Sequence, residues 1–226
     1  HVRSRRQRQM CIRDRNNGTQ NHNYIVLDFS SPNKLEIKLK EFIKKNSINY
    51  DVIINNSGGP PSGELENATT EDLLLAFNLH LISFHKILGV LLGGIKNKES
   101  GRIINIISTS VKQPLNGLGV SNTIRGAVAN WAKTLANELG PYNITVNNIL
   151  PGATNTGRLK EIINNKAQKL NLKESSIEKQ MADQVPLKRI AEPIEVANAV
   201  VFLASNKASY ISGINLPVDG GRTKSL

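Results

Sequence analysis

The sequence predicts an α/β domain in which a parallel sheet carries helices on both faces. Two observations support this prediction. Apolar runs of strand length alternate along the chain with segments of helix length. The strand-like runs are also apolar throughout, which is typical of parallel strands buried on both faces. With 226 residues, of which 39% are hydrophobic, the chain can bury one core, so we expect one domain.

Five segments have the character of buried strands. Each contains a run of Ile, Val and Leu that ends in acidic, small or polar residues: YIVLDF (24–29), DVIINNSGG (51–59), RIINIIS (102–108), ITVNNILPG (144–152) and ISGINLPVDGG (211–221). In open parallel sheets, ligands bind outside the carboxyl ends of the strands. The residues at these ends are therefore the first candidates for a functional site.

Helices are expected between and after these strands. They are predicted at residues 33–46, 69–95, 121–140 and 193–205. Thr69 and Asp72 have the spacing of a loose capping box, Gly140 is a stop signal, and Pro193 suits a first helical position. Residues 158–185 are polar and prone to form helix, and we expect them to form a mobile lid.

Residues 1–15 differ from the rest of the chain in their cations. They hold six Arg, one Asp and no Lys, for a net charge of +5, whereas all 18 Lys lie in the remainder. One interpretation is a basic arm that binds phosphates. The interpretation that we adopt is a disordered or foreign extension. We therefore divide the chain into a basic tail at 1–20 and one domain at 21–226. Because the domain is only mildly basic, we do not expect it to bind nucleic acid.

Composition also disfavours several classes of protein. No apolar run reaches the roughly 18 residues of a membrane span, and no secretory signal is present, so we predict a cytoplasmic protein without a membrane partner. The single cysteine cannot form an internal disulfide or build a cysteine metal site. His80 and His85 lie five residues apart and share a helix face poorly, so we predict no metal.

The strand ends, in their order and spacing, resemble those of a known enzyme family. VIINNSGG resembles the family's Asn-Asn-Ala-Gly stretch with Ser57 in place of alanine, AFNL supplies a helical asparagine at Asn78, and GRIINIIS ends in Ser108. LPGATNT resembles its Pro-Gly segment, and residues 185–221 match its C-terminal block almost position by position. The chain from about residue 24 to 221 thus resembles the short-chain dehydrogenases/reductases, most closely 3-oxoacyl-acyl carrier protein reductases.

The resemblance implies a Rossmann-like, doubly wound parallel sheet that binds NAD or NADP and acts on a small carbonyl or alcohol substrate. It also implies a homo-oligomer, either a dimer or a tetramer. The catalytic positions that it implies are Ser108, Ser121, Arg125 and Asn78. The cofactor-binding positions that it implies are Asp28, Asn55, Asn56, Ser57, Gly58, Pro151, Gly152, Thr154 and Thr156.

The first departure from the family concerns the start of the fold. The strand containing Asp28 corresponds to the family's third strand, so we expect an incomplete sheet that lacks the first strand, its Gly-rich turn and the second strand. The resemblance implies that the lost first strand lies at the centre of the sheet. The Gly-rich turn supplies backbone N–H groups to the pyrophosphate, and no other segment offers a substitute. We therefore expect this chain to be an inactive fragment of a longer parent.

The second departure concerns the catalytic pair. The family has a tyrosine thirteen residues after the serine and a lysine four residues later, and counting from Ser108 gives Ser121 and Arg125. A phenol beside a cation can donate a proton to a carbonyl, whereas a serine hydroxyl is a much weaker acid and arginine keeps its proton. Ser121 and Arg125 can polarise a carbonyl without easily completing proton transfer. Lys112 is the nearest alternative donor, although a solvated lysine is the simpler interpretation.

Purely structural interpretations stay open for these residues. Ser121 suits an N-cap, and Arg125 can serve to hold an acidic partner or a carbonyl. Thr154 and Thr156 can bind a carboxamide or begin a helix. Trp131, Leu135 and Leu139 repeat every four residues and suit a packing face, although the resemblance also implies that their helix packs across a subunit interface.

Two functions remain in view. The first is a divergent NAD(P)-dependent oxidoreductase that is truncated here. The alternative is a non-catalytic homologue that serves as a binding or assembly subunit, because the usual acid and its cation are both replaced. Binding of nucleic acid through the arginine tail is a weaker third possibility.

Overall fold

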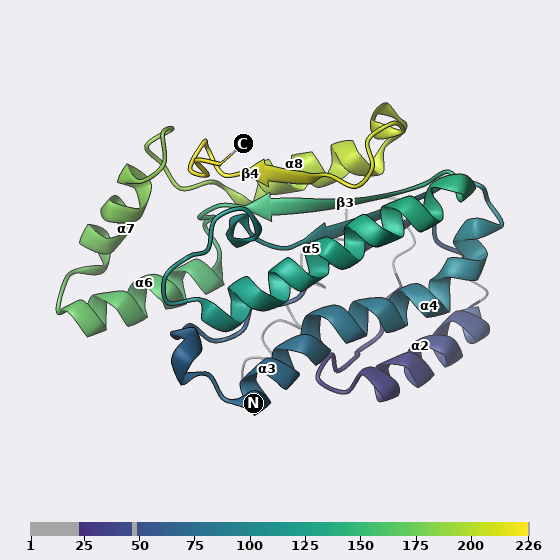
Figure 1. The fold of residues 1–226 in the computed structure, drawn as a ribbon, viewed down its shortest axis with the longest axis horizontal. Helices are drawn as coiled ribbons and strands as arrows, with labels where there is room; N and C mark the ends of the chain where they lie inside the picture. Colours follow the sequence, from purple (N-terminus) through teal and green to yellow (C-terminus); the bar gives the residue numbers. More distant parts are fainter. Residues whose placement is uncertain (1–22, 47–48, 226) are drawn as a thin grey trace.

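The computed structural model describes residues 23–46 and 49–225. Within them, one sheet contains the strands β1 (Val52–Asn55), β2 (Gly101–Ile106), β3 (Ile144–Pro151) and β4 (Asn215–Val218). The strands lie in that order and are all parallel, so their carboxyl ends meet at one edge. Figure 1 shows β3 and β4 pointing in the same direction. The predicted α/β class with a parallel sheet is confirmed.

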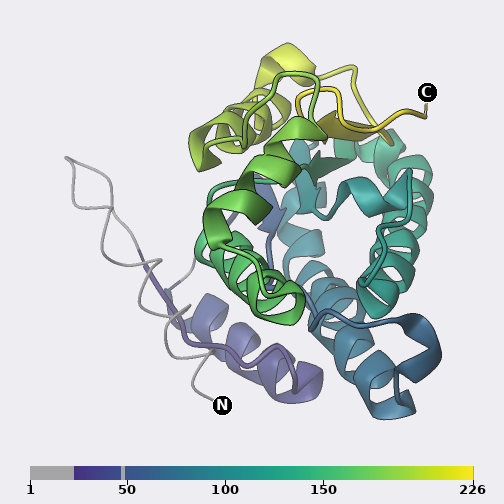
Figure 2. The same ribbon diagram turned by 90° about the vertical axis from the view of Figure 1, so that its left-hand side faces the viewer.

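Helices cover both faces of the sheet, as predicted. One face packs against α8 (Pro193–Ala204), and the other packs against α4 (Ser83–Lys96) and α5 (Gly119–Leu139) (Figures 1 and 2). A further helix, α2 (Pro32–Asn46), lies outside α4. Pro193 is the first residue of α8 and Gly140 caps α5, so both of these predicted helix ends are confirmed.

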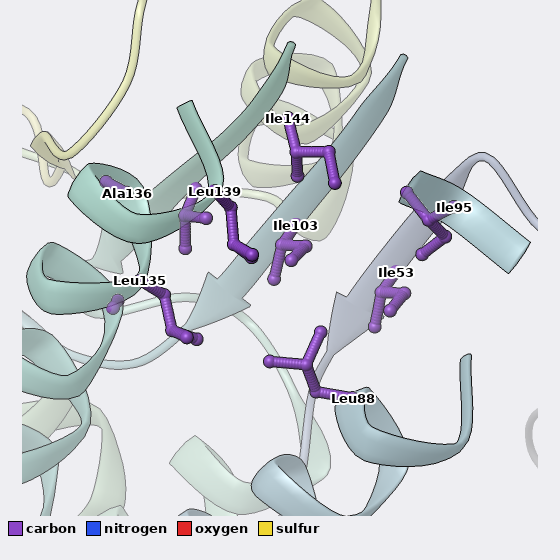
Figure 3. Packing of buried hydrophobic residues seen from close by; sticks show 10 residues of the cluster. Ile53, Leu88, Ile95, Ile103, Leu135, Ala136, Leu139 and Ile144 are labelled. Carbon is purple, nitrogen blue, oxygen red and sulfur yellow. The ribbon is translucent and has the colours of Figure 1, made fainter. Parts of the chain in front are cut away.

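The core follows the alternation of side chains along each strand. Ile103 packs toward α4 and α5, and its neighbour Ile104 packs toward α8. Figure 3 shows the first of these clusters, in which Ile103 and other strand residues meet Leu88 of α4 and Leu135 of α5. Because both faces of β3 are covered, Ile144 to Leu150 are all buried.

A long helical segment precedes β2. It joins α3 (Thr70–Phe77), the π-helix η2 (Asn78–Ile82) and α4, and the capping box of Thr69 and Asp72 at its start is confirmed. By length and composition alone, Thr70–Lys96 could cross a membrane, a property that the search for unbroken apolar runs did not reveal. In the structure, its side chains Phe84, Leu88 and Ile95 lie in the core beside the sheet.

Two helices lie beyond the carboxyl edge of the sheet. They are α6 (Gly157–Leu170) and α7 (Glu174–Asp183), which lie side by side (Figures 1 and 2). The two helices share a small apolar cluster of their own. The predicted helical character of 158–185 is confirmed, and the mobility of this segment stays a prediction. Short helical turns complete the described elements: η1 (Leu65–Asn67), η3 (Thr109–Val111), η4 (Gly140–Tyr142) and η5 (Asn206–Ala208).

The predicted strand at 24–29 is wrong. These residues form no strand, and Tyr24 and Val26 are 71% and 48% exposed. A buried strand needs hydrogen-bonding neighbours, and among the described residues no strand lies on the free side of β1 to provide them. The expectation of a lost strand at this place stays a prediction, and the predicted tail at 1–20 lies outside the described residues.

The predicted N-cap at Ser121 is also wrong. Helix α5 begins two residues earlier, at Gly119, and Leu118 is its N-cap. A Cβ on residue 119 would lie 2.5 Å from the backbone of Leu65, so the glycine allows the two segments to approach closely. Sequence periodicity does not reveal this contact at the start of the helix.

Candidate functional site

A row of asparagine side chains aligns the four strands. Asn55, Asn105, Asn148 and Asn215 are neighbours in the sheet register. Asn55 Nδ2 donates to Asn105 Oδ1 (2.7 Å), Asn105 Nδ2 donates to Asn148 Oδ1 (2.8 Å), and Asn148 Nδ2 donates to Asn215 Oδ1 (2.8 Å). Sequence periodicity does not predict this row, although every one of the four apolar strands contains at least one asparagine and β3 contains two, Asn147 and Asn148. The Asn55 amide nitrogen is therefore used in a hydrogen bond within the sheet, although the residue is a predicted cofactor-binding position. The row also fixes the strand ends relative to one another.

The predicted site residues follow these aligned strand ends. The exposed Asn56 and Gly58 and the half-buried Ser57 come after β1, while Pro151 ends β3 and Gly152 follows it. All of them lie at the carboxyl edge of the parallel sheet. The structure therefore places these cofactor-binding candidates along one rim.

Asp28 reaches this region without belonging to a strand. Its carboxylate accepts hydrogen bonds from the backbone N–H (3.0 Å) and the hydroxyl (2.7 Å) of Ser30. The carbonyl of the next residue, Phe29, accepts a hydrogen bond from Ser83 Oγ (2.9 Å) at the start of α4. Phe29 also packs against the cluster that contains Ile107, the residue before Ser108.

Ser108 lies between β2 and the turn η3. Its Oγ accepts a hydrogen bond from the backbone N–H of Ser110 (3.1 Å). The turn packs against α5, the helix that carries Ser121 and Arg125 near its start. The structure thus brings three of the four predicted catalytic residues to neighbouring segments, with Ser108 and Ser121 half-buried.

Arg125 is the buried cation of the site. It is 6% exposed, and its Nη1 donates to the carbonyl of Ile106 (3.0 Å) at the end of β2. A Cβ built on Gly59 would lie 3.9 Å from Nη2, so the guanidinium also borders the loop after β1. The interpretation that Arg125 holds a carbonyl is confirmed, and its Nε has no hydrogen-bond partner among the described residues. Burial lowers the pKa of Arg125 to about 10, which leaves it charged at neutral pH.

A serine–histidine pair lies beside this cation and was not predicted. Ser57 Oγ is 2.6 Å from Nδ1 of His80, a fully buried residue of η2. Burial, with a smaller contribution from the charge of Arg125, lowers the pKa of His80 to about 3. His80 is therefore neutral at ordinary pH. The apolar segment 69–95 contains two histidines, His80 and His85, and a histidine in such a segment is ordinarily a core residue.

The remaining candidates have mixed roles. Asn78 is half-buried at the junction of α3 and the π-helix, a position where helical irregularity often accompanies function. Thr156 caps α6, so the helix-start interpretation is confirmed for it, and Thr154 Oγ1 donates to the carbonyl of Gly152 (3.1 Å). Lys112 is half-buried and caps η3. Within residues 23–46 and 49–225, no group of three or more His, Cys, Asp or Glu side chains is placed to hold a metal ion.

Comparison with known sequences identifies related enzymes. The family model for enoyl-(acyl carrier protein) reductase matches residues 3–223. The NADPH-dependent reductase BacG of Bacillus subtilis (strain 168) is 33% identical over 176 residues, which are 78% of this chain and 68% of BacG. The 3-oxoacyl-[acyl-carrier-protein] reductase FabG of Buchnera aphidicola subsp. Baizongia pistaciae (strain Bp) is 35% identical over 200 residues, which are 87% of this chain and 76% of FabG.

Comparison with solved structures agrees with these sequence matches. A short chain dehydrogenase family protein from Francisella tularensis subsp. tularensis SCHU S4 has a TM-score of 0.85 at 26% identity, over 92% of this chain and 84% of that one. The fold, the aligned strand ends and the sequence matches lead to the same conclusion. This chain belongs to the short-chain dehydrogenase/reductase family.

Proposed function

We propose that the protein containing this chain is an NAD(P)-dependent oxidoreductase that acts on a small carbonyl or alcohol substrate. The observation that carries the proposal is the placement of Arg125. A guanidinium without an acidic partner is costly to bury. Among the described residues Arg125 forms no ion pair, and its guanidinium lies between the end of β2, at Ile106, and the loop after β1, at Gly59. A polar ligand at the rim would offset that cost.

The rim fits the nicotinamide half of such a cofactor. Arg125 offers an unpartnered buried Nε–H, Ser108 and Thr154 offer hydroxyl groups, and Gly152 brings bare backbone to the edge. A Cβ at Gly152 would lie 2.8 Å from Cα of Asp219, so the two strand ends approach closely there. The related BacG is named as NADPH-dependent.

The chemistry divides between the cofactor and the chain. The bound nicotinamide supplies or accepts the hydride. Ser108 orients the substrate oxygen, Ser121 and the charge of Arg125 polarise it, and Asn78 holds a water molecule through which a proton from bulk solvent reaches the developing alkoxide. The neutral Ser57–His80 pair packs beneath this charge without adding a second cation.

Fluorescence titration with NADH and NADPH tests the proposal, with the full gene product that contains this chain. We expect saturable binding of at least one cofactor. We also expect Arg125→Met to weaken that binding by about tenfold, the effect of losing a charge-assisted hydrogen bond. The matched control is Arg189→Met, which removes an exposed arginine paired with Glu195. Absence of binding for both cofactors contradicts the proposal.

A non-catalytic role is the second candidate, because Ser121 and Arg125 stand where the family has its tyrosine and lysine. If this protein binds the cofactor without catalysis, the double substitution Ser121→Tyr with Arg125→Lys creates a ketone-reducing activity that the unsubstituted protein lacks. Turnover of ketones by the unsubstituted protein rules this candidate out.

We further propose that the protein is cytoplasmic and forms a homo-oligomer. We also propose that its basic tail at 1–20 is separate from the domain at 21–226.

Leu135 and Leu139 belong to the core of the described chain, and half-buried Trp131 packs against it, so the packing-face interpretation of α5 is confirmed. A subunit contact through α5 would therefore use its exposed residues, such as Asn130 and Lys133.

A further inference from the structure

A polar cavity of about 410 Å³ lies beside the candidate site. Thr109, which follows Ser108 directly, lines one wall of the cavity together with Gln113, and the end of α7 lines another. The third wall is the segment after β4, which contributes Arg222 and Lys224. A volume of this size suits a small-molecule site.

The two cations on this wall lack acidic partners. Neither Arg222 nor Lys224 forms an ion pair with any other described residue. Arg222 Nη2 donates to Gln184 Oε1 (3.1 Å), and the backbone N–H of Lys224 donates to Gln113 Oε1 (3.4 Å). One carboxylate, that of Asp183, also lines the cavity. The lining therefore carries more positive than negative charge.

Asp219 holds this segment in place. Its Oδ1 accepts from the backbone N–H of Gly221 (3.0 Å), and its Oδ2 accepts from the backbone N–H (2.8 Å) and hydroxyl (2.6 Å) of Thr223. Burial alone would raise the pKa of Asp219, but hydrogen bonds from Thr223 and from the backbone of Gly221 and Arg222 lower it overall. The ionised carboxylate thus fixes the turn that presents both cations.

We infer that this cavity binds an oxyanion carried by the substrate, and that Arg222 is the residue that recognises it. The planar guanidinium can donate two parallel hydrogen bonds to a carboxylate or a phosphate, and Lys224 adds a second positive charge. The inference rests on the proposed function, because a substrate held here extends from Arg222 toward Ser108. It makes the preferred substrates anionic carbonyl compounds.

Two pairs of probes test the charge requirement in the full gene product without cofactor. Acetoacetate is compared with its neutral methyl ester, and dihydroxyacetone phosphate is compared with dihydroxyacetone. Dissociation constants are measured from amide chemical shifts of the ¹⁵N-labelled protein, with the signals of Gly221 and Thr223 reporting on the site. We expect at least one anion to bind about tenfold more tightly than its neutral partner. The tighter anion distinguishes a carboxylate site from a phosphate site.

Variants assign the effect to Arg222. Arg222→Gln should remove the preference for the anion, and Arg222→Lys should keep part of it because the charge remains. Arg189→Gln is the matched control, since Arg189 is exposed and paired with Glu195. Thermal unfolding of each variant checks that the fold is intact. Equal binding of charged and neutral probes, or an unchanged preference in a folded Arg222→Gln protein, overturns the inference.

The outcome separates this inference from the proposed function. If NADH or NADPH binds while anions and neutral probes bind equally, only the inference about Arg222 fails. If anions bind through Arg222 while neither cofactor binds, the proposed function fails and the anion site remains.

Discussion

At the scale of single residues, burial decides what Arg125 and His80 can contribute. Arg125 keeps its charge because even a pKa of about 10 lies well above neutral pH. His80 loses its charge because neither its surroundings nor the nearby guanidinium favours a second cation. Of these two residues only Arg125 is charged at neutral pH, and its charge can stabilise a developing alkoxide but cannot supply the proton that completes it.

The first prediction concerns the pH dependence of stability. The pKa of His80 is about 3 in the folded protein and near its usual 6.5 in the unfolded chain. Between these values the unfolded chain binds the proton, so the free energy of unfolding falls as the pH falls. The difference is worth roughly 3 kcal/mol between pH 6.5 and pH 4. Urea denaturation at a series of pH values should show this loss in the wild type and its absence in His80→Gln.

A second histidine provides the control. His85 is exposed, so His85→Gln should retain the pH dependence of the wild type. Glu36 and Glu195, whose pKa values are lowered mainly by hydrogen bonds from basic side chains, also lose stabilising interactions in acid. They are present in every variant and cancel in the comparison. Parallel curves for the wild type and His80→Gln would contradict a neutral buried His80.

At the scale of elements, the asparagine row explains how the strand ends stay aligned. Each buried amide in its middle uses one donor and one acceptor within the sheet, so the row is satisfied only in the observed register. A shift of one residue in any strand would leave buried amides unpaired. The row therefore adds specificity to a sheet whose other contacts are mostly apolar.

The second prediction tests the centre of this row. Asn105→Ala leaves Asn55 Nδ2 and Asn148 Oδ1 without their partners, and two unpaired buried polar atoms should cost about 2–5 kcal/mol in the free energy of unfolding. Asn137→Ala, at an exposed position of α5, is the control and should change stability little. Chemical denaturation measures both. Similar values for the two variants would show that the row contributes nothing to stability.

The elements also show how far the sequence could predict the fold. The runs at 102–108 and 144–152 became strands because their apolar residues are buried on both faces by helices that the sequence also predicts. The run at 24–29 is also mainly apolar, yet it forms no strand, because no strand among the described residues lies beside it to pair with. The local apolar pattern shows that a segment can form a strand. Whether it does so depends on the neighbouring strands with which it can form hydrogen bonds.

The candidate site divides in the same way. The rim residues Asn56, Ser108 and Pro151 could be found because they follow apolar runs, and parallel topology then brings the run ends together. The pair of Ser57 and His80 could not, because it joins a strand end to a π-helix through tertiary packing. The start of α5 likewise lies against a loop far earlier in the chain, at Gly63 and Leu65, a contact that local pattern does not predict.

At the scale of the whole molecule, burial falls from the centre of the sheet toward its periphery. β3 is buried along nearly its whole length, whereas Ile54 in β1 is 50% exposed because α8 does not cover that strand. α6 and α7 pack mainly against each other beyond the carboxyl edge (Figure 2). They are also tied to the rest by a few bonds, such as that from Arg158 to the carbonyl of Pro60 (2.7 Å). A segment with few core contacts opens at low cost, as a lid over the site would need to do.

The last prediction follows from this gradient and is tested by hydrogen exchange. Amides of 144–150 should exchange only through global unfolding, because both faces of β3 are covered, β2 pairs with Ile144–Ile149 and β4 pairs with Asn148–Pro151. Amides of 157–183 should exchange much faster, through local opening of α6 and α7, and those of 52–55 should fall between. Mass spectrometry of exchange time courses with and without added urea separates these regimes, since only global opening accelerates strongly with urea. If 157–183 exchanged as slowly as 144–150, the two helices would be part of the rigid core and could not serve as a lid.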